Sequence, residues 1–160
     1  MTDASTPVER FEVQRQLAAS PATVFAVLRD PKGHVRIDAS GMLMSAEGEP
    51  AEKVGDQFVM HMDRESLNDQ PLGKYDVAVI ITQYEQDQLI EWKVAGITSG
   101  RPSINHVYGY RLEPSEVGTL ATSYYDWSQI SDENKQRGVF PIIAEATLRA
   151  SLGILARTVE

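Results

Sequence analysis

Alternating apolar and polar residues mark most of this chain as a series of β-strands. Phe11, Val13 and Leu17 alternate with Glu and Gln side chains, the period-two pattern of a strand with one buried face. The strand pattern returns in six further segments, at residues 42–45, 57–67, 75–84, 89–94, 104–112 and 119–130. Most of these segments are joined by short connections, so we expect about seven strands in a largely antiparallel sheet.

Two short helices are predicted directly after the first strand. Ser20 and Asp30 each stand just before a proline. A Ser or Asp side chain at an N-cap accepts from the free amides of the first turn, and proline suits the first helical position. The two helices should therefore begin at Pro21 and Pro31.

The hydrophobic period changes near the C-terminus, where a longer helix is predicted. One apolar stripe follows the helical repeat at Leu148, Leu152, Leu155 and Val159. With Pro141 at the first helical position and residues 133–139 as a looser turn before it, the helix would have about 19 residues and a length of roughly 28 Å. We expect an α+β fold in which the sheet wraps around this helix.

Composition narrows the classes of function. The chain has 160 residues, which fits one domain over residues 1–160, and residues 1–8 are expected to be a flexible segment. A net charge of -8 argues against nucleic acids and anionic membranes as partners. Residues 1–9 lack the basic start and apolar core of a signal peptide, and no apolar run reaches the roughly 18 residues of a spanning helix, so a cytoplasmic protein is expected.

Several kinds of catalytic site find no support in the sequence. The chain has no cysteine, which excludes disulfides and thiolate nucleophiles. His34, His61 and His106 stand on separate predicted elements without the spacing of a zinc site. No phosphate-binding loop, dinucleotide glycine pattern or serine nucleophile elbow occurs, so we expect neither a metal nor a cofactor.

The chain resembles the START-like (SRPBCC) superfamily, which has the helix-grip fold of the major birch pollen allergen, the lipid-transfer START domains and the polyketide cyclase/dehydrase proteins. The likeness covers nearly the whole chain and rests on residues 17–25, the helix break at Asp30 and Pro31, residues 90–92, residues 110–114 with 118–119, and the final helix. The resemblance implies a cavity between the sheet and the final helix that holds an apolar or amphipathic small molecule.

Two neighbouring strands place polar and aromatic side chains on the inner face of this expected sheet. If Leu112 faces the core, as the resemblance suggests, alternation puts His106, Tyr108 and Tyr110 beside it. The same count on the last strand turns Ser123, Tyr125 and Trp127 inward. We interpret these six residues as a ligand-binding wall; the alternative is a closed core with the tyrosine hydroxyls at its edge.

Other candidates surround this wall. Met60 and Met62 share one strand face and suit an adaptable pocket, although a methionine pair is equally ordinary in a core. Asp38 and His34 lie one helical turn apart near the expected cavity mouth, where they would form a solvated pair. His61 should point outward.

The leading hypotheses differ in the role that they give to His106. The first is a binding protein for a small apolar or amphipathic molecule, monomeric or homodimeric. The second is a polyketide cyclase/dehydrase-type enzyme in which His106, with Tyr108 and Tyr125, moves protons. A third has the cavity closed by its own aromatic side chains and an outer surface used for protein contacts.

Overall fold

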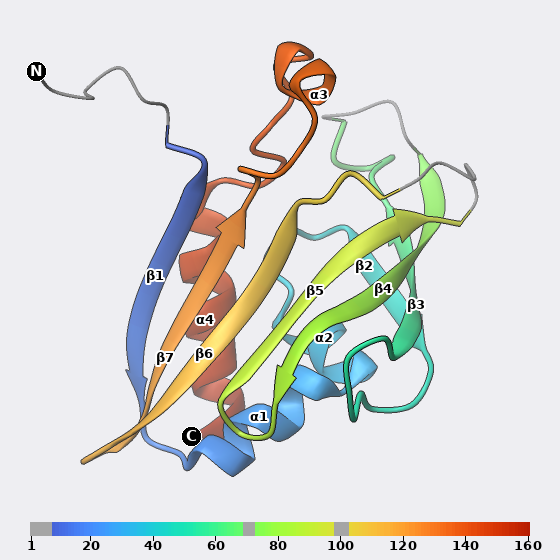
Figure 1. Ribbon diagram of the computed structural model, residues 1–160. Coiled ribbons are helices and arrows are strands. Elements are labelled where there is room, and N and C mark those ends of the chain that lie inside the picture. Colours follow the sequence, from blue (N-terminus) through green and yellow to red (C-terminus); the bar gives the residue numbers. More distant parts are fainter. Residues whose placement is uncertain (1–7, 69–72, 98–102) are drawn as a thin grey trace, which may run out of the picture.

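A curved sheet backed by a C-terminal helix forms the framework of the computed structural model, which describes residues 8–68, 73–97 and 103–160 (Figure 1). The expected flexibility of residues 1–8 concerns a segment that lies, except for Val8, outside the described residues. The strands are β1 (Arg10–Leu17), β2 (Leu43–Glu47), β3 (Gln57–Asp63), β4 (Lys74–Glu85), β5 (Leu89–Gly96), β6 (Val107–Ser115) and β7 (Gly118–Asp126). The helices are α1 (Pro21–Arg29), α2 (Pro31–Ile37), α3 (Asp132–Gln136) and α4 (Glu145–Val159).

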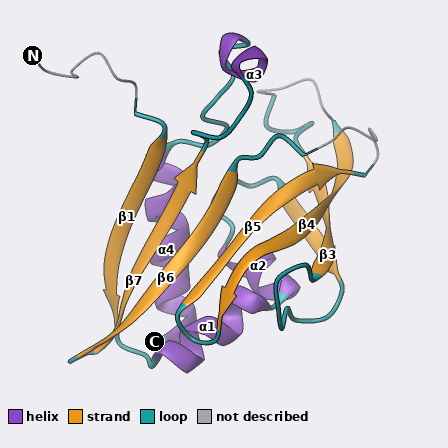
Figure 2. Cartoon of the chain, in the orientation of Figure 1, coloured by secondary structure: helices purple, strands orange, loops and turns teal. Residues whose placement is uncertain are grey.

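All seven strands belong to one antiparallel sheet. Their order is β1-β7-β6-β5-β4-β3-β2, so the first strand pairs with the last and the other neighbours follow in sequence. Helices α1, α2 and α4 lie on one side of the sheet, with α4 running along β1 and β7 (Figure 2). The predicted α+β helix-grip fold is confirmed.

The two short helices begin where the caps predict. Ser20 Oγ accepts a 3.2 Å hydrogen bond from the Thr23 amide, and Asp30 Oδ1 accepts one of 3.0 Å from the Lys32 amide. Each cap residue has an extended backbone and is followed by proline. These contacts satisfy amides that the first helical turn leaves free.

The prediction for the start of the final helix is wrong. Helix α4 begins at Glu145 and has 15 residues, and Pro141 lies in the irregular segment before it, after a cis peptide bond. Proline also suits a turn outside a helix, and the N-cap residue Ala144 offers no side-chain acceptor that would mark the true start. The looser turn expected at residues 133–139 overlaps the short helix α3, which begins at Asp132 and is capped by Ser131.

The apolar stripe of α4 packs onto the sheet as its spacing predicts. Leu148, Leu152 and Leu155 are buried, whereas Arg149 is exposed and bonds Glu145 at 2.6 Å on the outer side. The strand boundaries differ in detail from the predicted ones. Strand β3 ends at Asp63 rather than at residue 67, and β7 ends at Asp126 rather than at residue 130.

Candidate functional site

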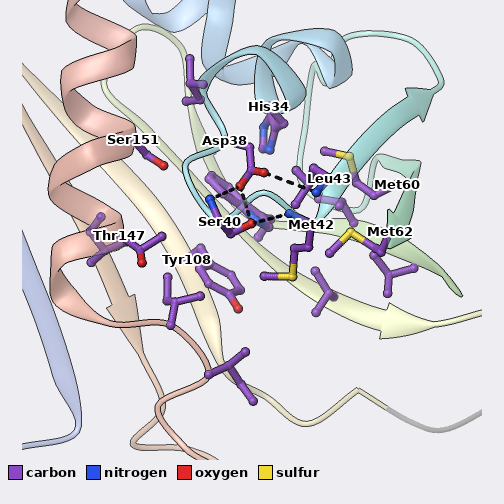
Figure 3. A pocket seen from close by; sticks show the side chains of 18 of the residues that line it. His34, Asp38, Ser40, Met42, Leu43, Met60, Met62, Tyr108, Thr147 and Ser151 are labelled. Carbon is purple, nitrogen blue, oxygen red and sulfur yellow. Dashed lines mark hydrogen bonds between the residues drawn. The ribbon is translucent and has the colours of Figure 1, made fainter. Parts of the chain in front are cut away.

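A cavity of about 330 Å³ lies between the inner face of the sheet, α2 and the first turns of α4 (Figure 3). Its volume is at the lower end of the range found for small-molecule pockets. The wall is mainly apolar and includes Leu28, Ile37, Met42, Met60, Met62, Val77, Val79, Trp92, Val94, Ile104, Ile142, Ile143 and Leu148. A space lined by such side chains can hold an apolar molecule.

Inward-facing side chains on and next to β6 and β7 form one side of the cavity. His106, Tyr108, Tyr110 and Ser123 line it, and Leu112 is buried on the same face. Tyr108 projects into the cavity from β6 (Figure 3). Trp92 on the adjacent β5 stacks on Tyr108 and Tyr110, with ring centroids 6.1 and 6.2 Å apart.

Tyr125 and Trp127 share this inner face but do not line the cavity. Tyr125 is fully buried and stacks on Tyr108 at 4.6 Å, while Trp127 packs on Tyr125 at 5.3 Å. The Ile142 amide donates to the Tyr125 hydroxyl at 3.4 Å, so the chain entering α4 lies across this part of the wall. Alternation predicts which face a side chain occupies but not which segment covers it.

His106 is a buried, neutral imidazole. Its Nδ1 atom lies 2.8 Å from the Tyr125 hydroxyl, and its ring meets the Phe140 ring edge-on at 5.3 Å. Burial lowers the pKa of His106 to about 4. A general acid or base works best with a pKa near the working pH, so His106 is poorly matched to proton transfer at neutral pH.

Asp38 lines the cavity, but its carboxylate holds a turn. Oδ1 accepts from the amide and hydroxyl of Ser40 at 2.9 and 2.6 Å, and Oδ2 accepts from the Gly41 and Leu43 amides at 3.0 and 3.3 Å. These bonds fix the path from α2 into β2 (Figure 3). Ser151 on α4 secures the same turn by accepting from the Ala39 amide at 3.1 Å.

The expected solvated pair of His34 and Asp38 is wrong. His34 is buried, its Nε2 atom lies 2.7 Å from the Leu28 carbonyl oxygen, and its ring packs on Trp92 at 4.6 Å. Burial lowers its pKa to about 4. The helix α2 turns this histidine inward toward the cavity instead of toward solvent.

His61 points outward, as predicted, and joins three strands. Its Nδ1 lies 2.7 Å from Asp76 on β4 and its Nε2 lies 3.1 Å from Glu47 on β2. The hydrogen bond to Asp76, then that to Glu47, raises the pKa of His61. Within residues 8–68, 73–97 and 103–160, no group of three or more metal-ligating side chains could hold a metal ion.

Sequence reasoning missed two important members of the cavity wall. Arg64 lines the cavity directly after β3 and is only 6% exposed. Continued alternation along β3 puts residue 64 on the same face as Met60 and Met62, so the sequence did contain a signal that its side chain turns inward. Trp92 lines the cavity from β5, where only the strand itself was predicted.

A family model described as polyketide cyclase / dehydrase and lipid transport matches residues 9–160. The match spans almost the whole chain, and the chain belongs to this family. Curated proteins gave no match. In the described part of the chain, no helix is long and apolar enough to cross a membrane.

Solved structures with the same fold come from several bacteria. Protein CV1439 of Chromobacterium violaceum is 19% identical, with 95% of this chain and 97% of that chain covered and a TM-score of 0.64. Protein Ms6760 of Mycobacterium smegmatis is 14% identical, with 94% and 90% covered and a TM-score of 0.67. The Aha1 dimer of Colwellia psychrerythraea is 16% identical, with 94% and 96% covered and a TM-score of 0.59. At these identities the likeness concerns the fold alone.

Proposed function

We propose that this member of the family binds a small apolar or amphipathic molecule in the cavity between the sheet and α4. The observation that carries the proposal is the mainly apolar surface around about 330 Å³ of space, with Asp38 and Arg64 as the acidic and basic side chains among the described lining residues. Ligand sites are usually built in this way, with an apolar surface for affinity and a few polar groups for orientation. The cavity makes the closed-core alternative less favourable.

Binding without chemistry is favoured over a cyclase or dehydrase activity. The family description covers both enzymes and lipid transport. His106 is the cavity residue considered for proton transfer, and its pKa of about 4 lies far from neutral pH. Its bond to Tyr125 serves the packing of the wall, which a binding protein needs as well. We also expect a cytoplasmic protein, either monomeric or homodimeric.

Titration with N-phenyl-1-naphthylamine, a neutral dye whose fluorescence rises in apolar surroundings, tests the proposal. The parent protein should bind one equivalent saturably. Thr147 lines the cavity from the first turn of α4 (Figure 3). Its neighbour Ala146 is exposed and is not among the lining residues. Thr147→Trp should fill the cavity and weaken dye binding by at least about tenfold, a loss of about 1.4 kcal/mol.

The matched control is Ala146→Trp, which adds the same side chain to the same turn but outside the cavity. It should bind the dye as the parent does. Equal affinities in the parent and in Thr147→Trp, or no saturable binding by the parent, would contradict a ligand in this cavity. An enzymatic role would instead require a reaction rate that falls by about 100-fold or more in His106→Ala.

A further inference from the structure

We infer that the cavity takes an amphiphile with a single acidic head, and that Arg64 holds this head. The inference rests on the proposed function and adds the chemical class of the ligand. Arg64 is the only Arg or Lys side chain among the lining residues that the structure describes. His34 and His106, which also line the cavity, are neutral near pH 7 because burial lowers the pKa of each to about 4.

The contact made by Arg64 inside the cavity can be improved by a ligand. Arg64 Nη1 donates to the sulfur of Met42 at 2.9 Å. A thioether sulfur is a weak acceptor, whereas a carboxylate or phosphate oxygen forms a shorter, charge-assisted bond with a guanidinium group. A guanidinium has five N–H donors, so Arg64 can keep other bonds within the protein and still serve a ligand.

A tyrosine hydroxyl lies near the same point. The Tyr75 hydroxyl is 4.0 Å from the Met42 sulfur. Arg64 Nη1 contacts the same sulfur, so the Tyr75 hydroxyl and the guanidinium face one atom. Arg64 and Tyr75 therefore offer donors around one position of the cavity wall.

These donors lie at one end of the cavity. Arg64 directly follows β3 and Tyr75 is the second residue of β4, where the end of β3 pairs with the start of β4. Toward the other end the wall includes Leu28 and Val79. An acidic head beside Arg64 with an apolar chain directed toward Leu28 matches this distribution.

The cavity lining that the structure describes includes one acidic side chain. Asp38 is the acidic residue among the described lining residues, and its two oxygens accept from Ser40, Gly41 and Leu43. The net charge of -8 disfavours the long-range approach of an anion. The preference for an acidic head must therefore arise from short-range contact with Arg64.

The size of the cavity guides the choice of probe. A volume of about 330 Å³ lies at the lower end of the range for small-molecule pockets, which suits a small single-chain amphiphile. Decanoate is such an amphiphile and is anionic at pH 7.5. 1-Decanol has the same chain with a neutral head, and decyl phosphate separates a carboxylate preference from a phosphate preference.

Competition against N-phenyl-1-naphthylamine measures the head preference. Decanoate or decyl phosphate should displace the dye at a concentration at least about tenfold lower than 1-decanol does. Arg64→Gln should abolish this preference while 1-decanol still displaces the dye. Lys74→Gln is the matched control, because Lys74 is an exposed cation at the same end of the sheet and outside the cavity lining; it should keep the preference.

A second measurement needs no variant. The carboxyl carbon of bound [1-¹³C]decanoate should titrate at a lower pH than in free decanoate, because a neighbouring guanidinium favours the ionised form. An unchanged or raised pKa, or equal displacement by decanoate, decyl phosphate and 1-decanol, would overturn the acidic head. If the parent nevertheless binds the dye, the proposal that the cavity binds a small molecule still stands. If the parent does not bind the dye, both the binding function and the acidic head are overturned.

Discussion

At the scale of single residues, Gly109 shows how a missing side chain organises the outer face of the sheet. The ring of Tyr124 lies over Gly109, and a Cβ atom at this position would collide with its outer end. The Tyr124 hydroxyl donates to Glu91 Oε1 at 2.8 Å, and Gln83 donates to the same oxygen at 3.0 Å. Arg10 lies over the Tyr124 ring at 4.3 Å, so the ring is held on several sides.

Gly109→Ala should therefore destabilise the protein by about 1–3 kcal/mol, because Tyr124 must move and Glu91, which is 9% exposed, loses a hydrogen bond. Gly153→Ala in α4 is the matched control. Its nearest new neighbour would be Arg15 Nη1 at 3.6 Å, and alanine is favoured over glycine in a helix by up to about 1 kcal/mol. Denaturant unfolding should show opposite signs for the two variants; two equal midpoints would contradict this account of Tyr124.

The pKa values of the three histidines should be shifted in opposite directions. Burial lowers the pKa of His34 and His106 to about 4, whereas hydrogen bonds to Asp76 and Glu47 raise that of His61. Imidazole NMR signals should therefore show His34 and His106 neutral throughout pH 5–8. His61 should become protonated above the ordinary histidine pKa of about 6.5.

The signs of the linked stability changes follow. As pH falls from about 6.5 to 4, His34 and His106 become protonated in the unfolded protein but remain neutral in the folded protein. The free energy of unfolding should therefore drop by about 3 kcal/mol for each residue. His61 stabilises the fold below about pH 6.5, and this contribution is lost as pH rises through its folded pKa. Signals of His106 that titrate near 6.5 would show that it is solvated.

Side-chain direction could be predicted from the sequence for most of the wall, but side-chain environment could not. Alternation placed Tyr108, Tyr110 and Ser123 correctly on the inner face. It gave no sign that Ile142 would contact Tyr125, because that contact joins segments 17 residues apart in the chain. Arg64 had the correct parity, yet an arginine is usually exposed, and only the fold shows that this one is buried.

At the scale of secondary-structure elements, local signals set the beginnings of helices where a side chain provides the cap. Ser20 and Asp30 mark α1 and α2 for this reason. Helix α4 has Ala144 at its N-cap and no side-chain bond there, so its start had no local signal. Its apolar stripe was nevertheless predicted, because a buried face with helical spacing is independent of the cap.

Leu152→Ala tests the packing of that stripe. Leu152 is 2% exposed, and truncation of a buried leucine costs about 2–5 kcal/mol. Val117→Ala in the β6–β7 hairpin is a control at a side chain that is 59% exposed, and it should change stability by less than about 0.5 kcal/mol. Chemical denaturation measures both; a Leu152→Ala variant as stable as the parent would mean that α4 does not pack on the sheet in this register.

At the scale of the whole molecule, the cavity results from how far α4 and α2 stand from the sheet. Sheet order and helix positions follow from patterns along the sequence, and they determine which faces meet. The remaining space depends on the sizes of side chains from β3, β4, β5, β6 and α4 together. Its volume was therefore beyond prediction from the sequence, although its place between sheet and helix was expected.

The methionine methyl groups offer the most direct test of the central claim that one apolar molecule binds in this cavity. Met42, Met60 and Met62 line it, whereas Met44 is 59% exposed and lies outside. In protein labelled with ¹³C at the methionine methyls, N-phenyl-1-naphthylamine should shift the signals of the three lining residues. These shifts should saturate at one equivalent while the Met44 signal stays in place. Shifts confined to Met44, or unchanged signals from all three lining residues, would contradict the account.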